Sequence, residues 1–113
     1  MGKTYGVLIM RDVKLLQPED FLELLFWNKR DYTLDAIKIL QLIGKRRINR
    51  KNWKDVVTQL SISKSRYYYI LRRLRSLGLV YREEDEYRLS ERFSKNLERI
   101  AEYWEELKER LEK

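Results

Sequence analysis

Residues 61–78 constrain the fold most, because they describe one amphipathic helix with a marker at each end. Their apolar side chains recur at the i, i+3, i+4, i+7 spacing of a single helical face: Tyr67, Ile70, Leu71, Leu74 and Leu77. The hydroxyl of Ser63 suits an N-cap, and Gly78 suits the left-handed residue that ends a helix. The sequence therefore predicts a helix from 64 to about 77 with one buried face.

The opposite face of this helix is basic and able to form hydrogen bonds. It carries Lys64, Ser65, Arg66, Tyr69, Arg72, Arg73 and Ser76. A helix that lies in a DNA groove while remaining anchored to a core needs this division. An ordinary solvated helix also carries Lys and Arg, so the residues around this helix must decide between the two interpretations.

The charge of the chain is concentrated around this helix. The 113 residues, enough for one domain, contain 25 Lys and Arg against 18 Asp and Glu, a net charge of +7. Residues 45–75 hold eleven basic side chains and a single acid, Asp55, whereas residues 91–113 hold seven acids and six bases. The expected partner is therefore anionic, with nucleic acid first and a membrane surface second.

The composition excludes several classes of function. Without Cys or His, the chain has no disulfide, no Cys/His zinc site and no histidine-based catalytic arrangement. No loop clusters carboxylates for calcium, and the tyrosines at 67–69 have no metal-binding neighbours for attack on phosphate. No apolar run reaches the roughly 18 residues of a membrane span. We expect a cytoplasmic protein that is not an enzyme and holds no metal or cofactor.

The N-terminal part is predicted to hold an extended segment and a short helix. Residues 5–16 favour a strand, a hairpin or an arm, because β-branched and apolar residues dominate them. Pro18 suits a first helical turn, and residues 21–27 are then apolar on nearly all sides. This helix is expected to be buried on more than one face or to contact another chain.

The remaining elements alternate helices with short polar connections. After a polar break at 28–32 we expect a helix over 34–44 capped by Thr33, a basic connector at 45–48, a helix over 50–60 capped by Asn49, and a turn at 61–63. After the 64–77 helix we expect a hairpin at 79–89 with a charged tip at 83–86, and a last helix over 91–112 capped by Ser90.

This order resembles the winged helix-turn-helix domain of archaeal and bacterial transcription regulators over about 33–90. The residues that carry the resemblance are Leu60, Ile62, Ser63, Lys64, Ser65, Tyr67, Leu71, Leu74, Leu77, Gly78, Leu79 and Val80. The resemblance implies a mainly α fold with a small β-hairpin wing. The chain then divides into an arm and short helix (1–32), the winged core (33–90) and a C-terminal helix (91–113), all in one compact domain. In layout, the flanking helices resemble the dimerising helices of MarR-like and PadR-like regulators.

The residues expected to contact DNA fall into two groups. Those on the 64–76 helix are Lys64, Ser65, Arg66 and Tyr69 near base edges, Tyr68 at the side, and Arg72 and Arg73 near the backbone. Those before or at the start of a helix, where the helix dipole also favours phosphate, are Arg46, Arg47, Arg50 and Lys51.

The wing departs from the family pattern. Its tip reads Glu83, Glu84, Asp85 and Glu86, where a wing that enters the minor groove carries basic residues. We therefore expect the tip to face solvent or the basic arm of a partner, with only Arg82 and Arg88 near the backbone.

The last helix carries an apolar stripe at heptad spacing. Its members are Phe93, Leu97, Ile100, Trp104, Leu107 and Leu111. The stripe suits either packing against its own domain or pairing with a second copy, and we favour a homodimer joined by a coiled coil. Such a dimer sets two recognition helices about one DNA turn, ~34 Å, apart.

The sequence thus favours a homodimeric, sequence-specific double-stranded DNA-binding protein, a transcription regulator of an archaeal type. An alternative is a protein-interaction winged helix in a replication, segregation or transcription assembly, with the acidic tip and residues 21–27 as its contact surfaces. An RNA-binding winged helix shares the charge argument. The sequence specifies no operator, no effector and no choice between activation and repression.

Overall fold

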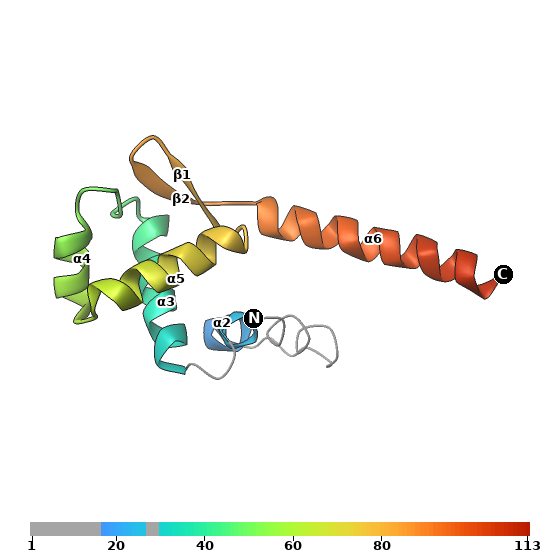
Figure 1. The fold of residues 1–113 in the computed structure, drawn as a ribbon, viewed down its shortest axis with the longest axis horizontal. Helices are drawn as coiled ribbons and strands as arrows, with labels where there is room; N and C mark the ends of the chain where they lie inside the picture. Colours follow the sequence, from blue (N-terminus) through green and yellow to red (C-terminus); the bar gives the residue numbers. More distant parts are fainter. Residues whose placement is uncertain (1–16, 27–29) are drawn as a thin grey trace.

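The computed structural model describes residues 17–26 and 30–113, so the predicted extended segment at 5–16 lies outside the described residues. The described part forms five α-helices and one two-stranded antiparallel hairpin (Figure 1). In chain order they are α2 (Pro18–Leu25), α3 (Arg30–Gly44), α4 (Trp53–Leu60), α5 (Lys64–Ser76), β1 (Val80–Glu83), β2 (Glu86–Leu89) and α6 (Arg92–Glu112). This arrangement confirms the predicted α+β class and its winged helix-turn-helix layout.

Helix α2 begins where Pro18 predicts and is buried as its composition requires. A capping box joins Gln17 and Asp20 at its N-terminus, and the backbone N–H of Gln17 donates to Asp20 Oδ2 at 2.9 Å. Leu22 and Leu25 are buried, as is Phe26 directly after the helix. The described part of the 21–27 segment therefore belongs mainly to the core, while Trp27 lies outside the described residues.

The predicted start of α3 is wrong. The helix already includes Arg30, and Thr33 lies inside it with 0% of its surface exposed, so Thr33 is not an N-cap. Burial of Thr33 and Asp35 on the inner face outweighs the local preference of threonine for a cap. The expected polar break at 28–32 is helical from residue 30 onward.

Helix α4, in contrast to α3, begins later than predicted, at Trp53. Asn49 Oδ1 accepts from the backbone N–H groups of Lys51 (2.8 Å) and Asn52 (3.1 Å), and Asn52 Oδ1 accepts from the N–H of Asn49 (3.0 Å). These reciprocal bonds form a turn ahead of the helix, so Asn49 organises the approach to α4 without capping it.

Helix α5 has the two ends that its sequence predicts. Ser63 Oγ accepts from the N–H of Arg66 at 3.0 Å. At the other end the N–H of Leu79 donates to Leu74 O (3.0 Å) and the N–H of Gly78 donates to Arg75 O (3.1 Å), which is the Schellman pattern. Gly78 has φ +84°, and a Cβ there would lie 3.3 Å from the backbone nitrogen of Phe93. Glycine is thus required for both conformation and space.

The hairpin is the predicted wing, and it is tied to the basic connector. Val80 pairs with Leu89 and Glu83 with Glu86, leaving a two-residue turn. The N–H of Tyr87 donates to Ile48 O at 3.1 Å, and Ile48 is fully buried. These contacts hold residues 45–50 against one edge of the wing.

The core lies where α2, α3, α5 and the wing meet. Its buried residues include Leu22, Ile39, Ile43, Tyr67, Ile70, Leu74, Val80 and Tyr87. Helix α6 begins at Arg92, and its N-cap residue is Glu91, not the predicted Ser90. The Ser90 hydroxyl lies one residue earlier and accepts from the N–H of Arg92 at 3.0 Å. It extends away from the body and contains no buried residue (Figure 1).

Candidate nucleic-acid interface

The outward face of α5 is exposed along its length. Opposite the buried stripe, the side chains of Ser65, Tyr69, Arg72 and Ser76 all lie at the surface. No carboxylate of the described residues lies within 4.0 Å of the Arg72 guanidinium. This face therefore presents hydroxyls, an aromatic ring and a cation on a rigid helix, which are groups that contact DNA bases and phosphates.

Arg66 does not point outward with this group. Its guanidinium makes an ion pair with buried Asp35 (3.3 Å) and a longer one with Asp31 (3.9 Å). It also lies 4.4 Å from the centre of the Tyr32 ring. The side chain is 28% exposed and joins α5 to α3. In this structure its two carboxylate contacts and the Tyr32 ring fix the position of α5, and its predicted contact with a base edge stays a prediction.

Tyr69 is the exposed end of the same contact region. Its ring packs edge-to-face on Tyr32, with centroids 5.2 Å apart, while 36% of the residue stays exposed. The aromatic pair restrains the ring without covering it. Tyr69 thus remains on the outward face as the sequence predicts.

The predicted surface role of Arg73 is wrong. Arg73 is 8% exposed, and its Nη2 and Nε donate to the carbonyl oxygen of Leu25 at 3.0 and 3.3 Å. Leu25 is the last residue of α2, so a cation sits at the negative end of that helix. Arg73 therefore joins α5 to α2 and is not available to a DNA backbone.

Trp53 lies beside the predicted contact residues of α5, although it was not among them, and it packs partly against the core. The Lys64 Nζ lies 4.4 Å and the Lys54 Nζ 5.7 Å from the centre of its ring. Half-buried Tyr68 lies beside it, at 6.3 Å between centroids and 55° between planes. This cluster joins the first turns of α4 and α5 and gathers two cations over one aromatic face. In the sequence, the adjacent Trp53 and Lys54 at the start of α4 are the signal that indicates this cluster.

The basic connector is exposed, except for the one apolar residue that anchors it. Arg46, Arg47 and Lys51 lie at the surface on either side of buried Ile48. Arg50 differs from them, because its Nη1 lies 3.8 Å from Asp85 Oδ1 and its backbone N–H donates to Asp85 O at 2.8 Å. Both side chains are 56% exposed, so this ion pair is weak and leaves Arg50 accessible.

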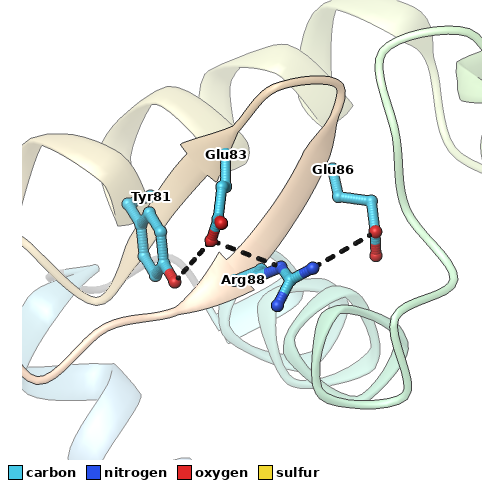
Figure 2. Close-up of polar contacts among 4 residues, drawn as sticks. All are labelled: Tyr81, Glu83, Glu86 and Arg88. Atoms are coloured by element: carbon cyan, nitrogen blue, oxygen red, sulfur yellow. Dashed lines mark hydrogen bonds and ion pairs between the residues drawn. The ribbon is translucent and has the colours of Figure 1, made fainter.

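Most of the carboxylates of the acidic wing contact other side chains of the same chain. Figure 2 shows Arg88 between two carboxylates, with Nε 3.8 Å from Glu83 Oε2 and Nη2 3.4 Å from Glu86 Oε2. The hydroxyl of Tyr81 donates to Glu83 at 3.2 Å. Together with the Arg50–Asp85 pair, these contacts reduce the negative field of the wing beside the basic connector.

Arg75 adds a cation that the predicted site did not include. It is exposed on the flank of α5 that faces the wing, and its guanidinium lies 5.8 Å from the centre of the Tyr87 ring. Between residues 45 and 75, eight basic side chains have no ion pair to a described carboxylate: Lys45, Arg46, Arg47, Lys51, Lys54, Lys64, Arg72 and Arg75. All eight are exposed, and three of them, Lys64, Arg72 and Arg75, belong to α5 itself.

The described residues contain no group of three or more carboxylates placed to hold a metal ion. Among them no helix is long and apolar enough to cross a membrane. Of the two surfaces of the protein-interaction alternative, the wing tip has a weak ion pair from Asp85 to Arg50, and Leu22, Leu25 and Phe26 lie in the core.

The α4–α5 pair, the hairpin that follows it and the exposed basic face define an α+β protein of winged helix-turn-helix layout. The chain belongs to an archaeal protein family, which it matches over residues 17–107. No match was found among curated proteins or among solved structures.

Proposed function

We propose that this protein binds double-stranded DNA with α5 in the major groove. In this proposal it acts as a homodimeric transcription regulator in the cytoplasm of an archaeal cell. The observation that carries the proposal is the outward face of α5, where Ser65, Tyr69 and Arg72 are exposed. Residues 45–75 hold eight cations without a described acidic partner, Arg72 included. The layout resembles that of MarR-like and PadR-like regulators.

In this proposal, base contacts and phosphate contacts come from different side chains. Ser65, Tyr69 and Arg72 extend from the outward face of α5 and approach base edges. A second group of side chains holds the phosphates on either side: Arg46, Arg47, Lys51, Lys54 and Lys64. Arg66 touches no base in this scheme and fixes the angle of α5 through Asp35.

The exposed apolar stripe of α6 supports the proposed homodimer. Its apolar stripe projects into solvent, and a second copy of the chain covers it in the proposed assembly. Two-fold symmetry then presents two α5 helices to one duplex and predicts a near-palindromic site.

A pair of charge reversals tests the proposal. Arg72→Glu reverses a cation on the outward face of α5, while Lys38→Glu makes the same change on the exposed side of α3. Fluorescence anisotropy of a 30-bp duplex, roughly three DNA turns, measures binding at fixed salt. We expect Arg72→Glu to weaken binding at least about tenfold and Lys38→Glu to leave it within about twofold.

Equal weakening by both variants would contradict a specific α5 interface and indicate a response to net charge alone. A double-stranded RNA of the same length in the same assay distinguishes DNA binding from RNA binding. We expect weaker binding to the RNA, because the deep, narrow major groove of A-form RNA does not admit a helix.

A further inference from the structure

Helix α6 presents an apolar face that the rest of the described chain, residues 17–26 and 30–91, leaves uncovered. Exposure reaches 64% at Ile100, 53% at Trp104 and 69% at Leu111. Phe93, the first member of the stripe, is the one that packs on the described core, edge-to-face against Phe21 with centroids 5.7 Å apart. A tryptophan and long aliphatic side chains exposed in one row need a partner.

The spacing of the stripe reads the same in both directions. Its steps are 4, 3, 4, 3 and 4, so pairs of members lie symmetrically about residue 102. The pairs are Phe93 with Leu111, Leu97 with Leu107, and Ile100 with Trp104. Two antiparallel copies therefore bring every member of one stripe opposite a member of the other, with no overhang.

Side-chain size favours this antiparallel pairing over a parallel one. A parallel pair places each residue opposite its own copy, so two Trp104 side chains occupy one layer and two Phe93 side chains another. The antiparallel pair sets Trp104 opposite the partner's Ile100 and Phe93 opposite the partner's Leu111. Facing a large residue with a smaller one keeps the layers even in volume.

The charges of α6 point the same way. Its first half, Arg92–Ala101, carries three bases and one acid, whereas Glu102–Glu112 carries five acids and two bases. Antiparallel copies place the basic half of each helix along the acidic half of the other, and they also oppose the helix dipoles. Parallel copies place like charge against like charge along the whole length.

We infer that the dimer forms through antiparallel α6 helices centred at residue 102, with the C-terminal end of each helix reaching the Phe93–Phe21 contact of its partner. Phe21 lines an apolar groove of ≈ 540 Å³ with Leu22, Leu40, Leu79 and Leu89, so the arriving turn continues an existing apolar surface. The two bodies then lie at opposite ends of the pair, with their Phe93 residues about 27 Å apart along it. This inference rests on the proposed homodimer.

Cysteine cross-linking tests the orientation, because the natural chain contains no cysteine. Leu97→Cys and Leu107→Cys are made separately in the full chain, one with a longer tag, and are oxidised alone and as a mixture. We expect each variant alone to stay uncross-linked and the mixture to give the mixed-size disulfide dimer. Cross-linking of each variant with itself would overturn the antiparallel arrangement in favour of a parallel one.

A distance measurement covers the case in which the core cysteines disturb packing. Spin labels at Lys113→Cys, on the exposed last residue, are expected about 33 Å apart in the antiparallel dimer and within about 15 Å in a parallel one. Absence of any dipolar coupling from a folded monomer would overturn the inference. Duplex binding measured on the same sample shows separately whether the proposed function survives.

Discussion

Arg66 and Asp35 join α5 to α3 through an ion pair of 3.3 Å. The Asp35 side chain is 12% exposed, and the Arg66 guanidinium also lies over the Tyr32 ring. This contact lies at the N-terminal end of α5, close to its outward face. The orientation of that face therefore depends on a partly buried charge pair, in addition to the apolar core.

Removal of Arg66 should destabilise the protein. Arg66→Ala leaves the Asp35 carboxylate buried without its cation, and we expect the free energy of unfolding to fall by about 1–3 kcal/mol. Urea denaturation followed by circular dichroism measures this. Arg72→Ala is the matched control on the same helix and should change stability by less than about 0.5 kcal/mol, because its side chain is exposed. Equal stability of the two variants would contradict the positioning role of Arg66.

Removal of the Tyr67 hydroxyl should be neutral or stabilising. Tyr67 is 1% exposed, and among the described residues its hydroxyl has no hydrogen-bond partner. Tyr67→Phe keeps the ring, so we expect the free energy of unfolding to stay equal or rise by up to about 1 kcal/mol at pH 7. A clear loss of stability on this substitution would show that the hydroxyl is satisfied in the fold.

Ionisation of the Tyr67 hydroxyl is expected to lower the stability of the protein at alkaline pH. Burial raises the pKa of Tyr67, with the nearby hydroxyls of Tyr87 and Tyr68 adding to the effect. Above about pH 10 the unfolded chain ionises this group while the folded chain holds it neutral, so stability falls as pH rises. Urea midpoints between pH 8 and 11, a range spanning the ordinary tyrosine pKa of about 10, should fall less steeply for Tyr67→Phe than for the natural protein. Parallel pH profiles would contradict this.

Glu84 at the wing turn is a site for stabilisation. It has φ +57°, a left-handed conformation that costs a non-glycine residue about 1–2 kcal/mol. Glu84→Gly relieves this cost but adds entropy to the unfolded chain, so we expect a net gain of up to about 1 kcal/mol. Glu83→Gly, the control one residue earlier in β1, should lose stability, because it removes the partner of Tyr81 and Arg88. Thermal melting of both variants gives the comparison.

A charge in the stripe of α6 should separate the dimer without unfolding the body. Ile100→Glu places a carboxylate in the centre of the proposed seam, while Glu102→Lys makes a charge change on the outward side two residues away. We expect light scattering to show a monomer for Ile100→Glu only, with a melting temperature set by the unchanged core. Loss of duplex affinity should accompany it, because two α5 helices no longer bind as one unit.

Features fixed by neighbouring residues were predictable from the sequence. The Ser63 cap, the Gly78 end of α5 and the wing follow from local spacing and turn chemistry, and the structure confirms them. Arg73 could not be placed in the same way. Its partner, the carbonyl of Leu25, lies 48 residues away, and the helical spacing puts Arg73 at the edge of the polar face.

Thr33 and Arg66 illustrate the same limit. Threonine is a residue type that favours an N-cap, but Thr33 is buried against the core and α3 begins three residues before it, at Arg30. Arg66 has the position on α5 expected of a base contact, but its guanidinium makes ion pairs with Asp31 and Asp35 of α3. Each difference arises where a contact between distant elements outweighs a local preference.

The salt dependence of duplex binding tests the central claim most directly. Anisotropy of a labelled 30-bp duplex, long enough for both half-sites, is titrated with the natural protein at several salt concentrations. If two basic α5 faces neutralise roughly six to ten phosphates, log K should fall linearly against log salt with a slope of about −5 to −9. A folded protein that binds no duplex at low salt would contradict the account.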